Sequence, residues 1–311
     1  MTPQPVEKLM PPNRLNRRQF LERSAAAASA LLLTSCSWAS SKTAAKRTAV
    51  DQVALGKTGL KLSRLGFGTG SNSGNVQFAL GQEQFNSLIH YAYDQGITYF
   101  DCAQSYRTFE WIKGAIKGLP REKIFLQSKI PGQPDQVLAA IDQHRKVFDT
   151  DYVDSLLIHC MTKDRWTDEW KRIMDAFNEA KDKKWIRAKG VSCHSLPALR
   201  AATASNWTEV HLVRVNPQAK YIDGANEGWN QSGLDLSPVL TELQTMHAKG
   251  RGVIGMKIIG NGDFTQPEDR EKSIRFAMSR PELDAVVIGF KSTAEIDEAI
   301  RRMNQALAEA A

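Results

Sequence analysis

Four side chains that can transfer or hold a proton stand at, or just after, the ends of three successive apolar segments of this chain. Asp101 ends one apolar run, in the stretch GITYFDCAQSY, and Tyr106 follows it by five residues. Lys129 ends the next run, FLQSK, and His159 ends the run after that, SLLIH. A buried carboxylate is costly unless a cation or hydrogen-bond donors meet it. We therefore expect Lys129 to pair with Asp101.

The chemistry that these residue types support is general acid catalysis at an oxygen atom. An ammonium group near Tyr106 favours the phenolate, so we expect Lys129 to lower the pKa of Tyr106 from its ordinary value of about 10. A phenol tuned in this way can donate a proton to a developing alkoxide and take it back in the reverse direction. His159 can hold the same oxygen in place.

Eight apolar runs alternate with amphipathic stretches and must position these side chains. The runs span 64–69, 97–103, 124–130, 153–160, 188–194, 210–217, 252–259 and 284–290. The stretches between them carry apolar residues at three- and four-residue spacing, which is typical of helices. Eight such units predict an α/β fold, the (β/α)8 TIM barrel, with its active site at the carboxyl ends of the strands. The preceding stretch DQVALGKTGLKLS predicts a β-hairpin that closes the barrel floor.

The first residues have the pattern of an export signal. A basic region containing RRQFL is followed by an apolar run, too short for a membrane span, and then by small residues. RRQFL resembles a twin-arginine signal, and LTSC resembles a lipoprotein cleavage box in which Cys36 would carry the lipid anchor. We therefore predict an export signal over 1–36, a flexible tether over 37–50 and a barrel domain over 51–311, exported to the periplasm by the twin-arginine machinery. The alternative is a disordered basic tail on a cytoplasmic protein.

Charge and cysteine content exclude several classes of function. Residues 1–35 hold five basic and two acidic residues and so contribute +3 of the formal +7, which leaves too little charge for a nucleic-acid partner. The remaining cysteines, Cys102, Cys160 and Cys193, are too few and too widely spaced for a disulfide framework. Each follows a strand-end residue, so strand alternation turns them toward the helix layer. We predict no metal site.

The combination of motifs resembles the aldo-keto reductase superfamily. The similarity runs from about Val53 to the last helix, with LGKTGLKLSRLGFGT as the opening hairpin and first strand and GITYFDCAQSY as the catalytic segment. The resemblance implies that Asp101, Tyr106, Lys129 and His159 form the catalytic tetrad, with Tyr106 as proton donor. It also implies reversible reduction of a small aldehyde or ketone by NADP(H), or by NAD(H), without a metal.

The resemblance further assigns a set of residues to the cofactor. They are Gly68, Thr69, Asp101, Ser192, Gln218, Met256, Lys257, Lys291 and Ser292. Ser192 matches a residue that holds the nicotinamide carboxamide, and the segment IGFKSTAEIDEA offers Lys291 and Ser292 to an adenosine 2′-phosphate. The sequence departs from the family pattern at Cys193, Pro217, Met256 and Ala299.

Two other functions are weighed against this one. The first is a reductase-like protein that binds nucleotide, or senses redox state, and turns over slowly. The changes at the positions that bind the nicotinamide carboxamide and stack on the nicotinamide in the family favour this function, and the complete tetrad opposes it. The second is a metal-dependent barrel hydrolase, which needs clustered carboxylate and histidine ligands at the strand ends that the sequence lacks. The oligomeric state stays open.

Overall fold

The computed structural model describes residues 47–229 and 231–310. The predicted export signal, Cys36 and most of the predicted tether lie outside these residues. The sequence predicts that the tether extends to residue 50, whereas Ala49 is fully buried. Its carbonyl accepts a hydrogen bond from the backbone nitrogen of Leu65, and its own nitrogen donates to the side chain of Asn304, both at 2.7 Å. The folded part of the chain therefore begins before residue 51.

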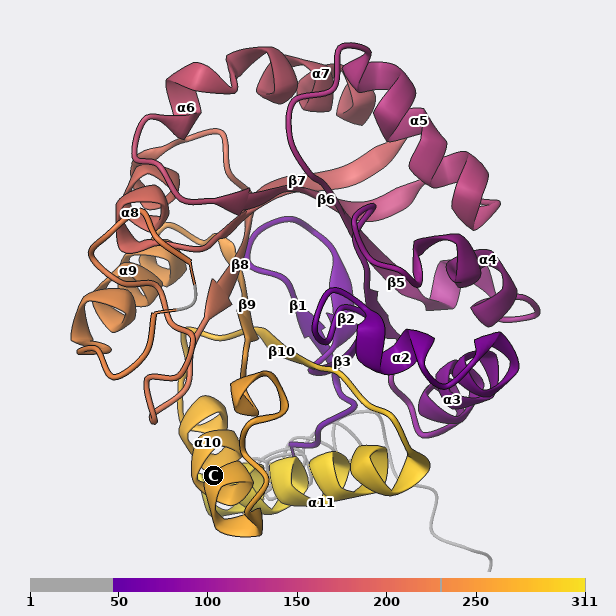
Figure 1. Cartoon of the computed structure of the whole chain (residues 1–311), viewed down its shortest axis with the longest axis vertical. Coiled ribbons are helices and arrows are strands. Elements are labelled where there is room, and N and C mark those ends of the chain that lie inside the picture. The colour runs from indigo at the N-terminus through magenta and orange to yellow at the C-terminus, as the bar shows by residue number, and fades with distance from the viewer. Residues whose placement is uncertain (1–46, 230, 311) are drawn as a thin grey trace, which may run out of the picture. The chain divides into compact units, whose positions relative to one another are not determined.

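Eight parallel strands form a closed barrel, which confirms the predicted fold (Figure 1). Strands that follow one another in the chain are neighbours in the barrel, and β10 closes it by pairing with both β9 and β3. The strands are β3 (Leu65–Gly68), β4 (Tyr99–Asp101), β5 (Phe125–Ile130), β6 (Val153–Met161), β7 (Ile186–Cys193), β8 (Val210–Arg214), β9 (Gly252–Met256) and β10 (Ala285–Ile288). Because all eight run in the same direction, their carboxyl ends meet at one mouth of the barrel.

The predicted hairpin is present and covers the opposite end of the barrel. It consists of the antiparallel strands β1 (Gln52–Ala54) and β2 (Lys61–Ser63). Leu55, Leu60 and Leu62 of this segment pack into one cluster with the side chains that fill the barrel interior. The hairpin thereby shields the apolar interior from water, which is the role that the sequence predicts for it.

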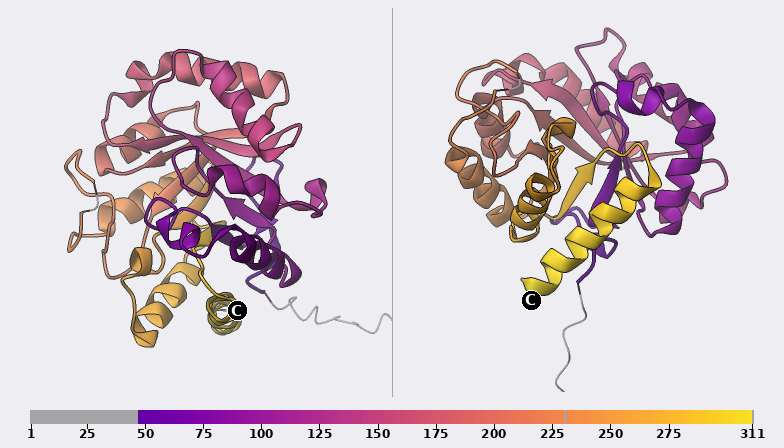
Figure 2. Two further views of the ribbon diagram at one scale, coloured as in Figure 1. Left: turned by 45° about the vertical axis from the view of Figure 1, so that its right-hand side comes forward. Right: turned by 60° about the horizontal axis from the view of Figure 1, so that its bottom comes forward.

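Helices form a ring outside the strands. The α-helices are α2 (Asn75–Phe78), α3 (Gln82–Asp94), α4 (Ile112–Ala115), α5 (Val137–Phe148), α6 (Trp166–Glu169), α7 (Lys171–Asp182), α8 (Leu196–Ala204), α9 (Ser237–Ala248), α10 (Pro267–Met278) and α11 (Thr293–Glu309). Within the described residues, three short 3-10 helices accompany them: η1 (Phe109–Trp111), η2 (Arg121–Lys123) and η3 (Gly260–Gly262). Figure 2 shows α11 along the outside of the barrel, where it contacts α10 on one side and α3 on the other. No helix in the described part of the chain combines the length and the apolar character needed to cross a membrane.

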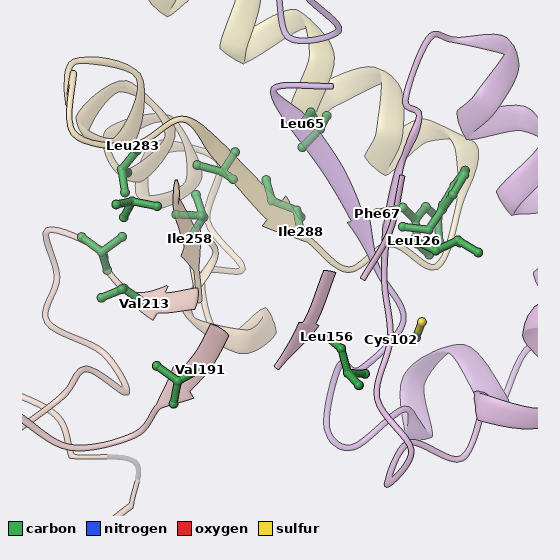
Figure 3. Close-up of a cluster of buried hydrophobic side chains, with 14 of the residues drawn as sticks. Leu65, Phe67, Cys102, Leu126, Leu156, Val191, Val213, Ile258, Leu283 and Ile288 are labelled. Atoms are coloured by element: carbon green, nitrogen blue, oxygen red, sulfur yellow. The ribbon is translucent and has the colours of Figure 1, made fainter. Parts of the chain in front are cut away.

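Strand alternation divides the side chains between two cores. Leu126 of β5 packs outward against the helices, while its neighbour Phe125 points into the barrel. Figure 3 shows the outward set, which includes Cys102. Cys193 belongs to the same outer cluster, as the sequence predicts.

Cys160 does not follow this alternation. The pairing of β6 with β7 shifts register between Ile158 and Met161, and Cys160 adopts a left-handed backbone conformation with φ of 64°. The bulge turns the Cys160 thiol toward the ring of His194, whose Nε2 lies 3.6 Å from Sγ. The prediction that all three cysteines face the helix layer is therefore wrong for Cys160.

Candidate active site

The predicted pairing of Asp101 with Lys129 is present at the carboxyl ends of β4 and β5. The strand register places Asp101 opposite Gln127, so Lys129, two residues further along β5, points to the same side of the sheet. Its Nζ donates to Oδ1 and Oδ2 of Asp101 at 2.7 and 2.8 Å and to the carbonyl oxygen of Cys102 at 2.8 Å. Only 1% of Lys129 and 4% of Asp101 are exposed.

Electrostatics keeps Lys129 charged despite its burial. Burial alone would lower the pKa of Lys129, but the Asp101 carboxylate and the Tyr106 hydroxyl outweigh it and raise the pKa above its ordinary value. Gln127 supports the carboxylate, since its Nε2 donates to Asp101 Oδ1 at 2.9 Å and to the Tyr99 hydroxyl at 2.8 Å. The sequence analysis missed Gln127. Its position two residues before Lys129 on the same strand is the signal that could have found it.

Tyr106 stands above this pair in the loop after β4. Its hydroxyl lies 3.3 Å from Lys129 Nζ, and its ring contacts Gly70 so closely that a Cβ on Gly70 would come within 2.2 Å of it. Burial raises the pKa of Tyr106 to about 12, although the ammonium of Lys129 opposes the rise. The expectation of a lowered pKa is therefore wrong, because desolvation of the phenolate exceeds the effect of an ammonium that Asp101 already neutralises in part.

His159 completes the group from the end of β6. Its ring lies against that of Tyr106, with centroids 5.7 Å apart and planes 76° apart, and its Nδ1 is 3.3 Å from the Ser105 hydroxyl. Burial, assisted by the charges of Lys129 and Lys257, lowers the pKa of His159 to about 3. The imidazole is thus neutral at physiological pH and can donate a hydrogen bond to an oxygen atom without adding charge.

A pocket of about 680 Å³ opens beside Tyr106 and extends to the amino-terminal part of α11. Its walls come from the loops that follow β3, β9 and β10 and from the helices α10 and α11. Six residues that the sequence assigns to catalysis or to the cofactor line it: Gly68, Asp101, Tyr106, Met256, Lys257 and Lys291. The volume lies within the range of about 300–1,000 Å³ that is usual for small-molecule and cofactor sites.

The charged residues of the pocket concentrate at its α11 end. Lys291 precedes the helix, and its backbone nitrogen donates to Glu295 Oε2 at 2.9 Å. Its ammonium lies 3.9 Å from the other oxygen of the same carboxylate. Glu298 binds Arg270 and Arg302, with nitrogen–oxygen distances of 2.9 and 2.7 Å. This end of the pocket therefore presents both signs of charge.

Several residues that the sequence assigns to the cofactor do not line this pocket. Gln218 is turned toward α10, where its amide donates to the Asp269 carbonyl at 3.0 Å. Ser192 is buried, and its hydroxyl lies 3.3 Å from His194 Nε2. The difference for Gln218 arises because it lies four residues beyond the end of β8 and no longer follows the strand's alternation.

Thr69 and Ser292 have structural hydrogen bonds of their own. The Thr69 hydroxyl donates to the backbone carbonyl of Asp101 at 3.1 Å, which ties β3 to β4. Ser292 is the N-cap of α11, and its hydroxyl accepts from the nitrogen of Glu295 at 3.3 Å. Neither side chain lines the pocket, and both support the segments that form its walls.

A second buried ion pair, which the sequence analysis missed, lies near the barrel mouth. Arg214 ends β8 and is fully buried; its Nε donates to Asp223 Oδ1 at 2.7 Å, and its guanidinium also donates to the carbonyl oxygen of His194. Burial raises the pKa of Asp223 to about 6, against the opposing effect of Arg214. An arginine inside the apolar run VHLVRVNP was the signal for it. Elsewhere in the described chain, no three His, Cys, Asp or Glu side chains gather into a group that could hold a metal ion.

Comparison with known proteins gives these features a family context. The model of the aldo/keto reductase family matches residues 64–311. An aldo-keto reductase of Glycine max is 34% identical over 125 residues, which are 35% of this chain and 36% of that protein. The glyoxal reductase of Bacillus subtilis is 32% identical over 168 residues, or 52% of each chain. The chain thus spans between about a third and a half of the length of these two relatives.

Solved structures show the same fold. A holo-form aldo-keto reductase of Bacillus halodurans superposes with a TM-score of 0.64 at 16% identity, covering 85% of this chain and 97% of that one. The family match includes the barrel from just before β3 to the end of α11, and with it every residue of the Asp101, Tyr106, Lys129 and His159 group. This chain belongs to the aldo/keto reductase family.

Proposed function

We propose that this protein is an NADP(H)-dependent carbonyl reductase that reversibly converts an aldehyde or ketone to an alcohol, with Tyr106 as the proton donor. The observation that carries the proposal is the contact between the Tyr106 hydroxyl and Lys129 at the wall of the large pocket. Lys129 is in turn held by Asp101 through two hydrogen bonds. A positioned phenol beside a fixed cation is an arrangement suited to general acid catalysis.

Two features of the pocket support the binding of a dinucleotide. It is continuous from Tyr106 to Lys291 and the first turns of α11, a helix of 17 residues whose amino end favours a phosphate group. Lys291 would hold the 2′-phosphate there, and Met256 and Gly68 would lie against the cofactor nearer to Tyr106. When bound, the nicotinamide cofactor would supply a hydride to the carbonyl carbon.

Each of the four grouped residues has a defined task in this mechanism. Tyr106 donates its proton to the carbonyl oxygen as negative charge develops there, and Lys129 stabilises the phenolate that remains. Asp101 fixes the position of the Lys129 ammonium. Neutral His159 donates a hydrogen bond to the same oxygen and so orients the carbonyl. In the reverse direction the Tyr106 phenolate accepts the proton of the alcohol.

The test is the substitution Tyr106→Phe, with Tyr91→Phe as the matched control. Tyr91 lies on α3, its hydroxyl donates to Asp297 Oδ1 at 2.8 Å, and neither residue lines the pocket. We expect Tyr106→Phe to lower the rate of NADPH oxidation with an aldehyde by roughly 10²-fold or more, while NADPH binding is retained. Glyoxal is a suitable first substrate because a relative is named a glyoxal reductase. Near-normal turnover of Tyr106→Phe would refute the proposed proton donor.

We further propose that the protein is exported through its amino-terminal twin-arginine signal and anchored by a lipid on Cys36. The sequence pattern described above supports this. Replacing Arg17 and Arg18 by lysine should keep the protein in the cytoplasm, and Cys36→Ala should release it from the membrane fraction. Unchanged export of the first variant would refute the signal, and an unchanged membrane fraction of the second would refute the lipid anchor.

A further inference from the structure

A second pocket, of about 500 Å³, opens at the end of the barrel opposite to Tyr106, and we call it the floor pocket. Its walls come mainly from the hairpin and from the segments in which β4, β5, β6 and β7 begin. Three of its lining residues are cations from separate elements: Lys61 of β2, Lys123 of η2 and Arg187 of β7. None of the residues that line it also lines the pocket beside Tyr106. The floor pocket is therefore a separate site.

A buried carboxylate fixes the guanidinium of Arg187 at the wall of the floor pocket. Only 1% of the Asp154 side chain is exposed, and its Oδ1 accepts a hydrogen bond from Arg187 Nη1 at 2.7 Å. Its Oδ2 accepts from Arg121 Nη2 at 2.7 Å and from the backbone nitrogen of Leu126 at 2.9 Å. The ring centroid of Tyr152 lies 4.0 Å from Arg121 Cζ and 5.6 Å from Arg187 Cζ. Arg187 is thus held in place before any ligand binds.

The two arginines differ in the hydrogen-bond donors that they leave unused. All three nitrogens of the Arg121 guanidinium donate to the protein, namely to the Thr150 hydroxyl, to two backbone carbonyls and to Asp154. Arg187 uses only Nη1, and its Nε and Nη2 have no hydrogen-bond partner among the residues that the structure describes. These two nitrogens form the fork with which an arginine binds two oxygens of a phosphate or a carboxylate.

The floor pocket has more positive than negative charge. Within the described part of the chain, the side chains of Lys61 and Lys123 make no hydrogen bond or ion pair. The carboxylates that line the pocket are Asp154, which the two arginines share, and Glu122. The two lysines and two arginines therefore bring four positive charges against two negative ones. A ligand with two negative charges would balance this excess.

We propose that the floor pocket binds a phosphomonoester, with its phosphate group held by Arg187, Lys61 and Lys123. The inference goes beyond the proposed reductase function and does not depend on it. A phosphomonoester carries nearly two negative charges at pH 7, and its three terminal oxygens can each meet one of the three cations. A carboxylate offers only two oxygens and one charge. The phosphate group could belong to a soluble compound or to a phosphomonoester lipid such as phosphatidate.

The experiment uses the double variant Lys61→Met, Lys123→Met, which removes two charges and leaves the partners of the buried Asp154 intact. The matched control is Lys117→Met, Lys272→Met. Both of these lysines are exposed, have no side-chain partner among the described residues and line neither pocket. Methyl phosphate is the soluble probe, and titration calorimetry and thermal shift measure its binding to the full chain. Circular dichroism verifies that both double variants are folded.

Two sources of the phosphate group give different results. If the ligand is soluble, methyl phosphate binds the wild type about 10-fold or more tightly than the Lys61→Met, Lys123→Met variant, as expected for loss of charge-assisted contacts. If the ligand is a lipid, the same difference appears with phosphatidylcholine vesicles that contain phosphatidate, measured by co-sedimentation. The vesicle experiment uses chains that also carry Cys36→Ala, so that a lipid anchor cannot contribute.

Dimethyl phosphate tests the preference for two negative charges, because this diester carries only one. It should bind the wild type more weakly than methyl phosphate does. Lys291→Ala, a substitution in the other pocket, should leave the binding of methyl phosphate to the floor pocket unchanged. The inference is wrong if neither methyl phosphate nor the vesicles distinguish the wild type from the Lys61→Met, Lys123→Met variant, or if the control variant loses as much binding. A protein that binds methyl phosphate in the floor pocket but reduces no aldehyde would instead refute the proposed function alone.

Discussion

Replacing Lys129 by methionine should expose how much the fold depends on the ion pair at the barrel mouth. The substitution removes four interactions at once: both oxygens of Asp101, the Cys102 carbonyl and the Tyr106 hydroxyl. It leaves the Asp101 carboxylate buried with Gln127 as its remaining side-chain donor. Breaking a buried pair by removing one partner typically costs about 3–5 kcal/mol. Because Gln127 still donates one hydrogen bond, we expect a loss of about 3 kcal/mol in the free energy of unfolding.

A second substitution separates the stranded charge from the lost packing. In the double variant Asp101→Asn, Lys129→Met, the buried carboxylate is gone and the amide can still accept from Gln127. We expect the double variant to be more stable than Lys129→Met alone, by about 1–2 kcal/mol, because an unpaired buried charge costs more than a neutral polar group. Urea unfolding followed by tryptophan fluorescence measures both differences, and circular dichroism verifies that each variant is folded before urea is added.

The same substitution should also remove activity. Without Lys129, the effect that opposes burial at Tyr106 is lost, so the pKa of Tyr106 rises further above its ordinary value. We expect carbonyl reduction to fall by about 10²-fold or more, with NADPH binding retained. The reasoning would be refuted if Lys129→Met were less stable than the wild type by under about 1 kcal/mol, or if Asp101→Asn gave no recovery in the double variant.

Three further predictions concern other parts of the molecule. Gly70→Ala should lower kcat by at least 10-fold with little change in the secondary structure. The new methyl group would approach the Tyr106 ring to 2.2 Å and must therefore displace it. Unaltered kinetics would show that this contact is dispensable. Lys291→Ala should raise the dissociation constant of NADPH more than that of NADH. Glu295→Gln should tighten the binding of NADPH alone, because the Glu295 carboxylate repels a 2′-phosphate. Titration calorimetry with both nucleotides measures both effects. The free energy of unfolding should fall as the pH drops from about 6.5 toward about 4, because buried neutral histidines whose pKa is lowered in the fold bind protons only on unfolding. Each such histidine contributes up to about 1.4 kcal/mol per pH unit. Urea unfolding at pH 7 and pH 5 measures this, and equal stabilities would contradict it. The histidines concerned are His144, with a pKa lowered to about 4, His159 and His211, with values lowered to about 3, and His194, lowered well below its ordinary value.

The sequence by itself determined the repeating units of the fold and the positions of the strand-end residues. Apolar runs that alternate with amphipathic stretches predict eight strands in order, and the closed barrel confirms them. A residue's place at the end of a strand is a local property, and parallel strands bring their carboxyl ends together without further information. Asp101, Lys129 and His159 could therefore be placed at one mouth, and the pairing of the first two followed from the cost of burying a charge.

Only the tertiary structure decided the electrostatics of these groups and the environment of the loops. The pKa of Tyr106 is raised rather than lowered because burial disfavours the phenolate, and the packing around the ring comes from other segments of the chain, Gly70 among them. The bulge in β6 reversed the direction of Cys160, and Gln218 turned toward α10 once it was beyond its strand.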